Sequence, residues 1–148
     1  MTRAKLLEFM RAQRYAVQAS VSATGAPQAA VVGIVVTDSF EIFLDTLAQS
    51  RKAQNLRRNA AIALVIGGTT PGDERTVQYE GLADEPSGAE LEELKSLYLA
   101  KFPRGHERQS WPGLIYLRGR PLWIRYSDFR CDPPVIVEFD KSQLASLA

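Results

Sequence analysis

The stretch Phe40–Asn59, FEIFLDTLAQSRKAQNLRRN, decides how this chain is interpreted. It begins with an apolar run that is typical of a β-strand and ends in a polar segment that is typical of a helix. Between the two, Asp45 and Thr46 close the strand, and a short loop leads to Ser50–Lys52. Serine is a favoured helix N-cap, and a helix N-terminus presents unpaired N–H groups and the positive end of the helix dipole. This order of elements therefore predicts a place where a negatively charged group can bind.

The charged pair Arg51-Lys52 makes that group a candidate phosphate. Arginine holds two oxygens with its planar guanidinium, and lysine adds a mobile point charge beside the helix N-terminus. A second interpretation stays open on the residues alone, because basic side chains in a first helical turn are commonly only solvated. Arg57 and Arg58 fall near the expected C-terminus of the helix, where cations are favoured without any ligand.

Hydrophobic periodicity and turn residues extend the prediction to the whole chain. Strands are expected at residues 15–22, 29–36, 40–44, 62–66, 75–84 and 114–129, and helices at 2–14, 50–58 and 87–103. The first three strands follow one another through short turns, which predicts a meander, and Pro133-Pro134 predicts an irregular tail. Ser87 and Glu90 have the spacing of a capping box. Consecutive short strands with few helices predict a mainly β (α+β) fold, a small antiparallel barrel with flanking helices.

The region Tyr15–Glu85 resembles the pyridoxamine 5'-phosphate oxidase-like, FMN-binding split-barrel family. In that family a strand ends in a short polar pair and Ser-Arg-Lys-Ala opens the next helix, which closes with basic and Asn residues. The matching segments of this chain are, in order, Asp45-Thr46, Ser50–Ala53, Arg57–Asn59, Ile62–Ile66 and the RTVQYEG segment Arg75–Gly81. The resemblance implies a six-stranded antiparallel split β-barrel with flanking helices.

The same resemblance implies FMN as the cofactor and a homodimer with two sites between its subunits. The FMN phosphate is then expected on Arg51 and Lys52, behind Ser50, with Asp45 and Thr46 beside the isoalloxazine ring. Two further residues complete the expected cofactor site, Thr76 and Trp111. Thr76 occupies a strand position from which the family often contacts the flavin of the neighbouring subunit. Trp111 either packs on the core or covers a flat ligand, held by the Pro112-Gly113 turn.

The chain departs from dedicated pyridoxamine phosphate oxidases in two places. They carry an Arg and a Lys on the second strand, where this chain has the apolar run Ala29–Val36, and they carry an Arg-Leu-His-Asp-Arg-type motif near the C-terminus, which this chain lacks. We therefore expect an FMN-dependent oxidoreductase that acts on another small molecule. Two alternatives remain: a non-catalytic flavin- or haem-binding stress protein, and a deazaflavin-dependent reductase.

Length and composition argue against several other classes of protein. The 148 residues predict a single domain over 1–148, and a net charge of +1 gives no overall field for nucleic acid or membrane surfaces. Cys131 is the only cysteine and His106 the only histidine, so neither an internal disulfide nor a zinc site is expected. His106 falls in a polar loop, either at the surface or at the mouth of the ligand site. A cytoplasmic protein is expected, because neither a signal peptide nor a membrane-spanning run is visible.

Overall fold

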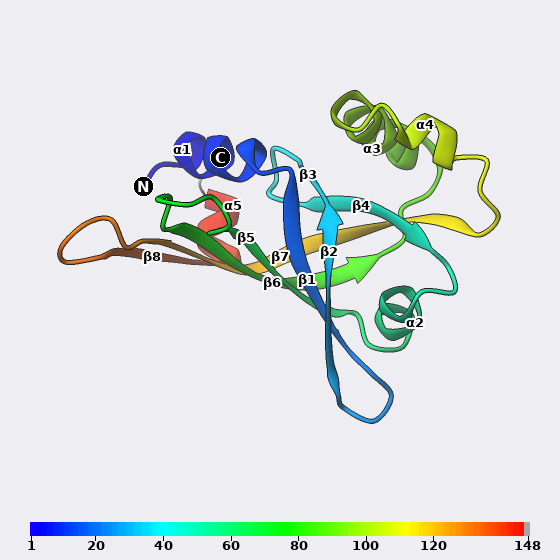
Figure 1. Ribbon diagram of the computed structural model, residues 1–148, viewed down its shortest axis with the longest axis horizontal. Coiled ribbons are helices and arrows are strands. Elements are labelled where there is room, and N and C mark those ends of the chain that lie inside the picture. The colour runs from blue at the N-terminus through cyan, green and yellow to red at the C-terminus, as the bar shows by residue number, and fades with distance from the viewer. Residues whose placement is uncertain (147–148) are drawn as a thin grey trace.

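The computed structural model describes residues 1–146 as one curled antiparallel sheet with flanking helices (Figure 1). In chain order its elements are α1 (Arg3–Ala12), β1 (Tyr15–Val21), β2 (Pro27–Gly33), β3 (Val35–Val36), β4 (Ile42–Leu47), α2 (Arg51–Arg58), β5 (Ala61–Gly67), β6 (Arg75–Asp84), α3 (Gly88–Lys101), α4 (Gly105–Arg108), β7 (Leu114–Asp128), β8 (Val135–Asp140) and α5 (Lys141–Ser146). None of the described helices has the length and apolar character needed to cross a membrane.

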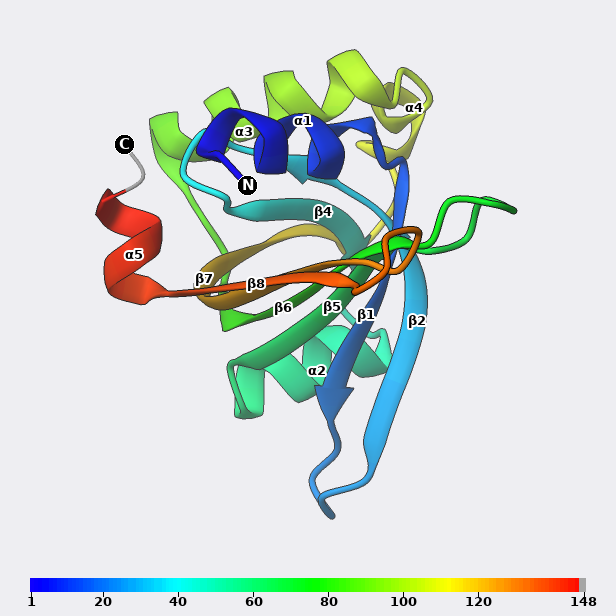
Figure 2. The same ribbon diagram turned by 90° about the vertical axis from the view of Figure 1, so that its left-hand side faces the viewer.

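The sheet has the strand order β2-β1-β5-β6-β7-β4-β3, and β8 also pairs with β7. The long strand β7 holds the two halves together, because its first part pairs with β4 and its second part pairs with β6 and β8. A β-bulge between Glu80 and Gly81 shifts the register along the β6–β7 pair. Bulges increase local twist, and the resulting curvature gives the half-barrel seen in Figure 2. The predicted class, a mainly β split barrel with flanking helices, is confirmed.

The sheet has eight strands rather than the six expected, and the predicted meander is wrong. The apolar run 29–36 is divided at Ile34, so that β2 pairs with β1 while β3 pairs with β4. Strand β4 then continues the sheet through β7 and does not pair with β2. The segment after Pro133-Pro134 is also more regular than expected, because Phe139 of β8 and Leu144 of α5 are buried in the core.

The main core lies inside the half-barrel, where α1 covers its open side (Figure 2). The α1 face that carries Leu6 and Met10 is fully buried, and Thr2 caps the helix by accepting from the backbone N–H of Lys5. A second cluster joins α3 to β3 and β4; its buried members are Val35, Phe43, Leu94, Tyr98 and Phe102. This second cluster fixes α3 beside the end of β4, which is where the predicted site begins.

Candidate functional site

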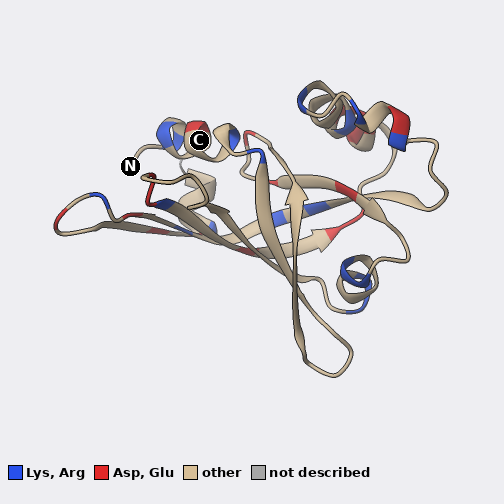
Figure 3. Cartoon of the chain, viewed as in Figure 1, with Lys and Arg blue, Asp and Glu red and all other residues tan. Residues whose placement is uncertain are grey.

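The N-terminus of α2 is built as the sequence predicts. The hydroxyl of Ser50 caps the helix by accepting from the backbone N–H of Ala53 at 3.2 Å. The Thr46 hydroxyl lies 3.1 Å from the Ser50 hydroxyl and accepts from the Lys52 ammonium at 3.3 Å. Strand β4 and helix α2 therefore bring Thr46, Ser50 and Lys52 into one polar cluster. Figure 3 shows basic residues on α2 at this end of the molecule.

Arg51 faces the β1–β2 hairpin. The side-chain amide of Gln28 lies between Arg51 and Asn55. When its oxygen faces Arg51, that oxygen accepts hydrogen bonds from Arg51 Nη2 at 2.8 Å and from Arg51 Nε at 3.0 Å. Asn55, buried on α2, donates from Nδ2 to the Ser20 hydroxyl at 3.1 Å. A cavity of about 240 Å³ opens here, which we call the inner cavity; it is lined by Gln18, Ser20, Gln28, Ala29, Ala30, Arg51 and Lys52. It is a polar chamber with cations on one side.

A larger cavity of about 710 Å³ lies between β2, the end of β4 and α3, and we call it the outer cavity. Its wall includes the apolar residues Val31 and Val32 and the ring of Phe102, which stacks on Tyr98 with ring centroids 4.9 Å apart. Its basic lining residues are Arg14, Lys52, Arg104 and Arg108. Lys52 lines both cavities, so the two adjoin at the N-terminus of α2.

Asp45 is held by two side chains that the sequence analysis did not connect to it. Arg108 donates from Nε to Asp45 Oδ2 at 2.8 Å, and the Tyr98 hydroxyl donates to Asp45 Oδ1 at 2.9 Å. Burial raises the pKa of the Tyr98 hydroxyl, and the negative charge of Asp45 raises it further. Tyr98 therefore stays protonated at neutral pH and remains a hydrogen-bond donor. Because these partners lie 53 and 63 residues from Asp45, no local sequence signal pointed to the pairing.

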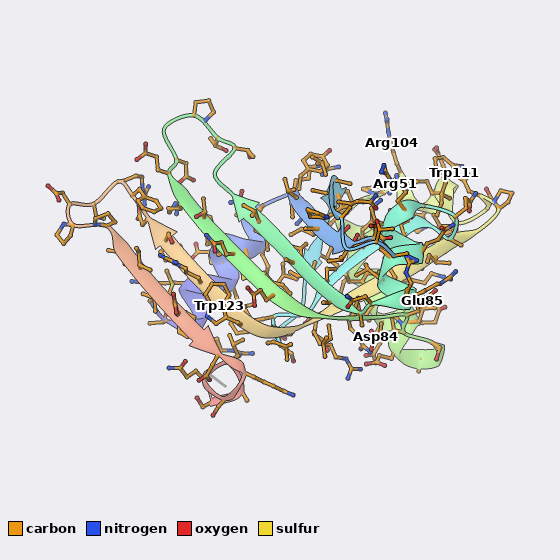
Figure 4. All side chains as sticks on the ribbon, turned by 90° about the horizontal axis from the view of Figure 1, so that it is seen from below. Arg51, Asp84, Glu85, Arg104, Trp111 and Trp123 are labelled. Atoms are coloured by element: carbon orange, nitrogen blue, oxygen red, sulfur yellow. The ribbon has the colours of Figure 1, made fainter. Side chains whose placement is uncertain are left out.

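Two of the predicted cofactor residues are not part of this arrangement within one chain. Thr76 is the second residue of β6 and pairs with Gly67, the last residue of β5. The β5–β6 loop lies at the end of the sheet away from α2 (Figure 1). Trp111 precedes β7 and is 51% exposed, so the expectation that it packs on the core is wrong. Figure 4 shows Trp111 toward the same end of the molecule as Arg51 and Arg104, but it lines neither cavity. His106 is exposed on α4 and also lines neither.

No group of three or more His, Cys, Asp or Glu side chains within residues 1–146 is placed to hold a metal ion. The chemistry of the site therefore rests on cations, amides, hydroxyls and aromatic rings. Such a donor set suits an organic anion with a planar part.

Comparison with known proteins agrees with this description. The family model described as pyridoxamine 5'-phosphate oxidase matches residues 2–127. The chain belongs to the pyridoxamine 5'-phosphate oxidase-like, FMN-binding split-barrel family. No curated protein matches it in sequence.

Solved structures share the fold at low sequence identity. A heme binding protein from Mycobacterium smegmatis is 15% identical with a TM-score of 0.83, and the match covers 99% of this chain but only 61% of that protein. A conserved hypothetical protein from Mycobacterium tuberculosis is 25% identical, with a TM-score of 0.73 and coverage of 88% and 86%. A pyridoxamine 5'-phosphate oxidase-related, FMN binding protein from Nostoc punctiforme is 16% identical, with a TM-score of 0.68 and coverage of 95% and 90%.

Proposed function

We propose that this protein binds FMN and uses it in an oxidoreductase reaction on a small molecule. The observation that carries the proposal is the pair Arg51 and Lys52 at the N-terminus of α2, at the junction of the inner and outer cavities. FMN has a phosphate dianion, a hydroxyl-bearing chain and a planar ring, and a donor set of cations, buried amides and aromatic side chains fits all three parts. The family model and the FMN binding relative support the same cofactor.

In this proposal each part of the site has one task. Arg51, Lys52 and the α2 N-terminus hold the phosphate, which places the ring toward the larger outer cavity. When bound, FMN supplies hydride or electron transfer, and the protein orients it and adjusts its electronics. The Tyr98–Asp45–Arg108 contacts keep the Asp45 carboxylate fixed at the wall of that cavity and its charge balanced.

The phosphate assignment predicts a specific loss on substitution. Arg51→Ala removes a charge-assisted contact that contributes roughly 1.5–3 kcal/mol, so FMN affinity should fall about 10- to 100-fold. Titration of FMN fluorescence with apo protein measures this. Riboflavin, which lacks the phosphate, should bind the wild type weakly and respond little to the substitution. Arg57→Ala is the matched control on the same helix, because Arg57 pairs with Glu85 at 2.8 Å and faces away from the cavities. Equal FMN affinity in Arg51→Ala and wild type would refute the assignment.

The absorption spectrum of protein purified from its native host tests the cofactor itself. We expect the bands of oxidised flavin. A Soret band would instead identify a haem protein like the structural relative from Mycobacterium smegmatis, and a single band at shorter wavelength would identify a deazaflavin. The one histidine of the sequence, His106, is exposed on α4 outside both cavities, so it offers no axial ligand within them.

We further propose that two copies associate through the outer face of β2, β1 and β5. Val31, Val17 and Val65 lie directly opposite one another across these strands, and their side chains are 70%, 38% and 45% exposed. An apolar row of this kind on a sheet is typical of an interface. On β6, Gln78 lies opposite Val65, and Thr76 is two residues from Gln78, so Thr76 lies on the same face as the row of valines. This position supports the expectation from the family that Thr76 contacts the flavin of the neighbouring subunit.

We also propose a reducing, cytoplasmic location, which the lone, exposed Cys131 supports.

The dimer proposal predicts a mass near twice 16.4 kDa in sedimentation velocity. Val31→Lys places a charge in the centre of the apolar row and should shift the protein to monomer, because an unpaired charge is costly to desolvate in an interface. Leu97→Lys is the control, since Leu97 is also exposed but lies on α3. A monomeric wild type that binds FMN tightly would contradict the proposal.

A further inference from the structure

Gln18, in the middle of β1, is a buried amide without a hydrogen-bond partner. Its side chain is 1% exposed, and neither Oε1 nor Nε2 has a hydrogen bond within the described structure. Its neighbours across the sheet, Ala30 on β2 and Leu64 on β5, carry no polar side chains. Buried side-chain amides are nearly always satisfied, because an unpaired one keeps the full cost of losing water. We therefore expect a bound ligand to supply the hydrogen bonds that the Gln18 amide lacks.

The inner cavity is where that partner has room. Gln18 lines it together with Ser20 and Gln28, and Arg51 and Lys52 line its other side. Its volume of about 240 Å³ is below the roughly 300–1,000 Å³ of sites that enclose a drug-sized ligand. It can therefore hold only part of a cofactor whose remainder lies in the adjoining outer cavity.

The hydrogen-bonding groups of an amide indicate which part of the cofactor lies beside Gln18. A glutamine side chain offers two N–H donors and a carbonyl acceptor. A phosphate dianion offers only acceptors, so it would leave Oε1 of Gln18 unpaired. The edge of the isoalloxazine ring has a donor and acceptors, but a phosphate held at Arg51 and Lys52 places the ring beyond the polyol chain, toward the outer cavity. Hydroxyl groups donate and accept, and they satisfy both ends of the amide. The cations of the same cavity are placed to hold a phosphate beside those hydroxyls.

We propose that Gln18 is a cofactor-binding residue that hydrogen-bonds the polyol chain between the ring and the phosphate. The inference rests on the proposed FMN function and deepens it. It divides the inner cavity into a polyol end at Gln18 and a phosphate end at Arg51 and Lys52.

The test uses Gln18→Met, which keeps the length of the side chain and removes its polar atoms. Without ligand, the variant should have a Tm a few degrees above wild type, because an unsatisfied buried amide is lost. FMN and riboflavin, which both carry the polyol, should each bind about 5- to 100-fold more weakly, as expected for two lost hydrogen bonds. Lumiflavin, which has the ring without the polyol, should bind both proteins equally. Arg51→Ala should behave differently, since it weakens FMN alone.

Three results would overturn the inference, and they have different meanings. Unchanged FMN affinity with a raised Tm would show that Gln18 is unpaired in the free protein but does not contact the flavin. A lowered Tm with equal weakening of all three flavins would show a purely structural role. A wild type that binds none of the flavins removes the proposed function itself, and the inference with it. If Gln18→Met does not fold, Gln18→Asn provides the same comparison, because it withdraws the amide by one methylene and should still weaken FMN and riboflavin but not lumiflavin.

Discussion

With FMN bound, the protein should oxidise pyridoxamine 5'-phosphate two to four decades less efficiently than a dedicated oxidase. That substrate carries its own phosphate, which must be held so that the reacting carbon faces the flavin. On the second strand this chain has the apolar run Ala29–Val36 where dedicated oxidases carry an Arg and a Lys, and Val31 and Val32 of that run line the outer cavity. The loss of two charge-assisted contacts, at roughly 1.5–3 kcal/mol each, corresponds to about two to four decades in catalytic efficiency.

The structure also shows why nearby cations do not compensate. The Lys101 ammonium donates to the backbone carbonyls of Gln13 and Ile34 at 2.6 and 2.8 Å, and burial lowers its pKa to about 8. Arg108 is paired with Asp45 at 2.8 Å. Arg104 lines the outer cavity, and the structure of residues 1–146 records no ion pair for it. Arg14 also lines this cavity, but its guanidinium lies over the Phe102 ring, with Cζ 4.6 Å from the ring centroid. Arg104 by itself replaces at most part of what the family uses.

The assay incubates FMN-loaded protein with pyridoxamine 5'-phosphate in air and follows pyridoxal 5'-phosphate and hydrogen peroxide. A dedicated oxidase measured in parallel sets the scale. Arg104→Ala is the informative variant, because any residual turnover that depends on the substrate phosphate should decrease further. Turnover equal to that of the dedicated oxidase would show that the prediction is wrong.

The second large effect is expected on stability, from Gly81→Ala on β6, at the β-bulge in the β6–β7 pair. A Cβ atom there would overlap the backbone carbonyl oxygen of Arg120 and lie 3.0 Å from its carbonyl carbon. Backbone atoms of β7 cannot move aside without breaking the long pairing of β6 with β7. We expect a loss of about 1–3 kcal/mol or more, as for other overpacked sites, which is a Tm decrease on the order of 3–12 °C.

Gly119→Ala is a matched control on β7, measured by the same thermal unfolding. A Cβ atom at Gly119 would lie 3.5 Å from Cγ2 of Ile62, which is ordinary van der Waals contact. Its Tm should therefore stay close to that of the wild type. Similar Tm values for Gly81→Ala and Gly119→Ala would contradict the view that the close approach at the bulge requires glycine.

The sequence predicted the α2 region because everything needed there is local. The strand end, the Ser50 cap and the cations follow one another within a few residues, and the structure has them in contact. The buried face of α1 was predicted for the same reason, since periodicity reports which face of an element is covered. In β1 the strand was predicted but its alternation was misleading, because Gln18 and Ser20 lie on the buried face while Tyr15 and Val17 are exposed. The family followed from this local order of elements.

Local patterns failed where a distant partner decides the outcome. Ser87 and Glu90 have capping-box spacing, but the Ser87 side chain makes no capping hydrogen bond. The Glu90 carboxylate instead binds the buried Arg118 guanidinium on β7. An ion pair with a strand 28 residues away outweighs a cap that gains only about 1 kcal/mol. The helical spacing of Leu97 with Leu94 and Tyr98 predicts a buried position for it, and this is also wrong. Leu97 is exposed, because α3 buries only a narrow stripe against β3 and β4.

By itself, then, the sequence determined the family, the half-barrel class and the polar cluster at the N-terminus of α2, because these depend on residues that are neighbours in the chain. Tertiary structure alone decided that Ile34 divides an apolar run between two strands, that Tyr98 and Arg108 hold Asp45, and that Gln18 lies unpaired in the inner cavity. Each of these depends on which strand or helix packs against which. The pairing of strands that are far apart in the sequence depends on how the whole sheet curls and on the apolar surface that this buries. A short window of residues therefore cannot predict which strands pair.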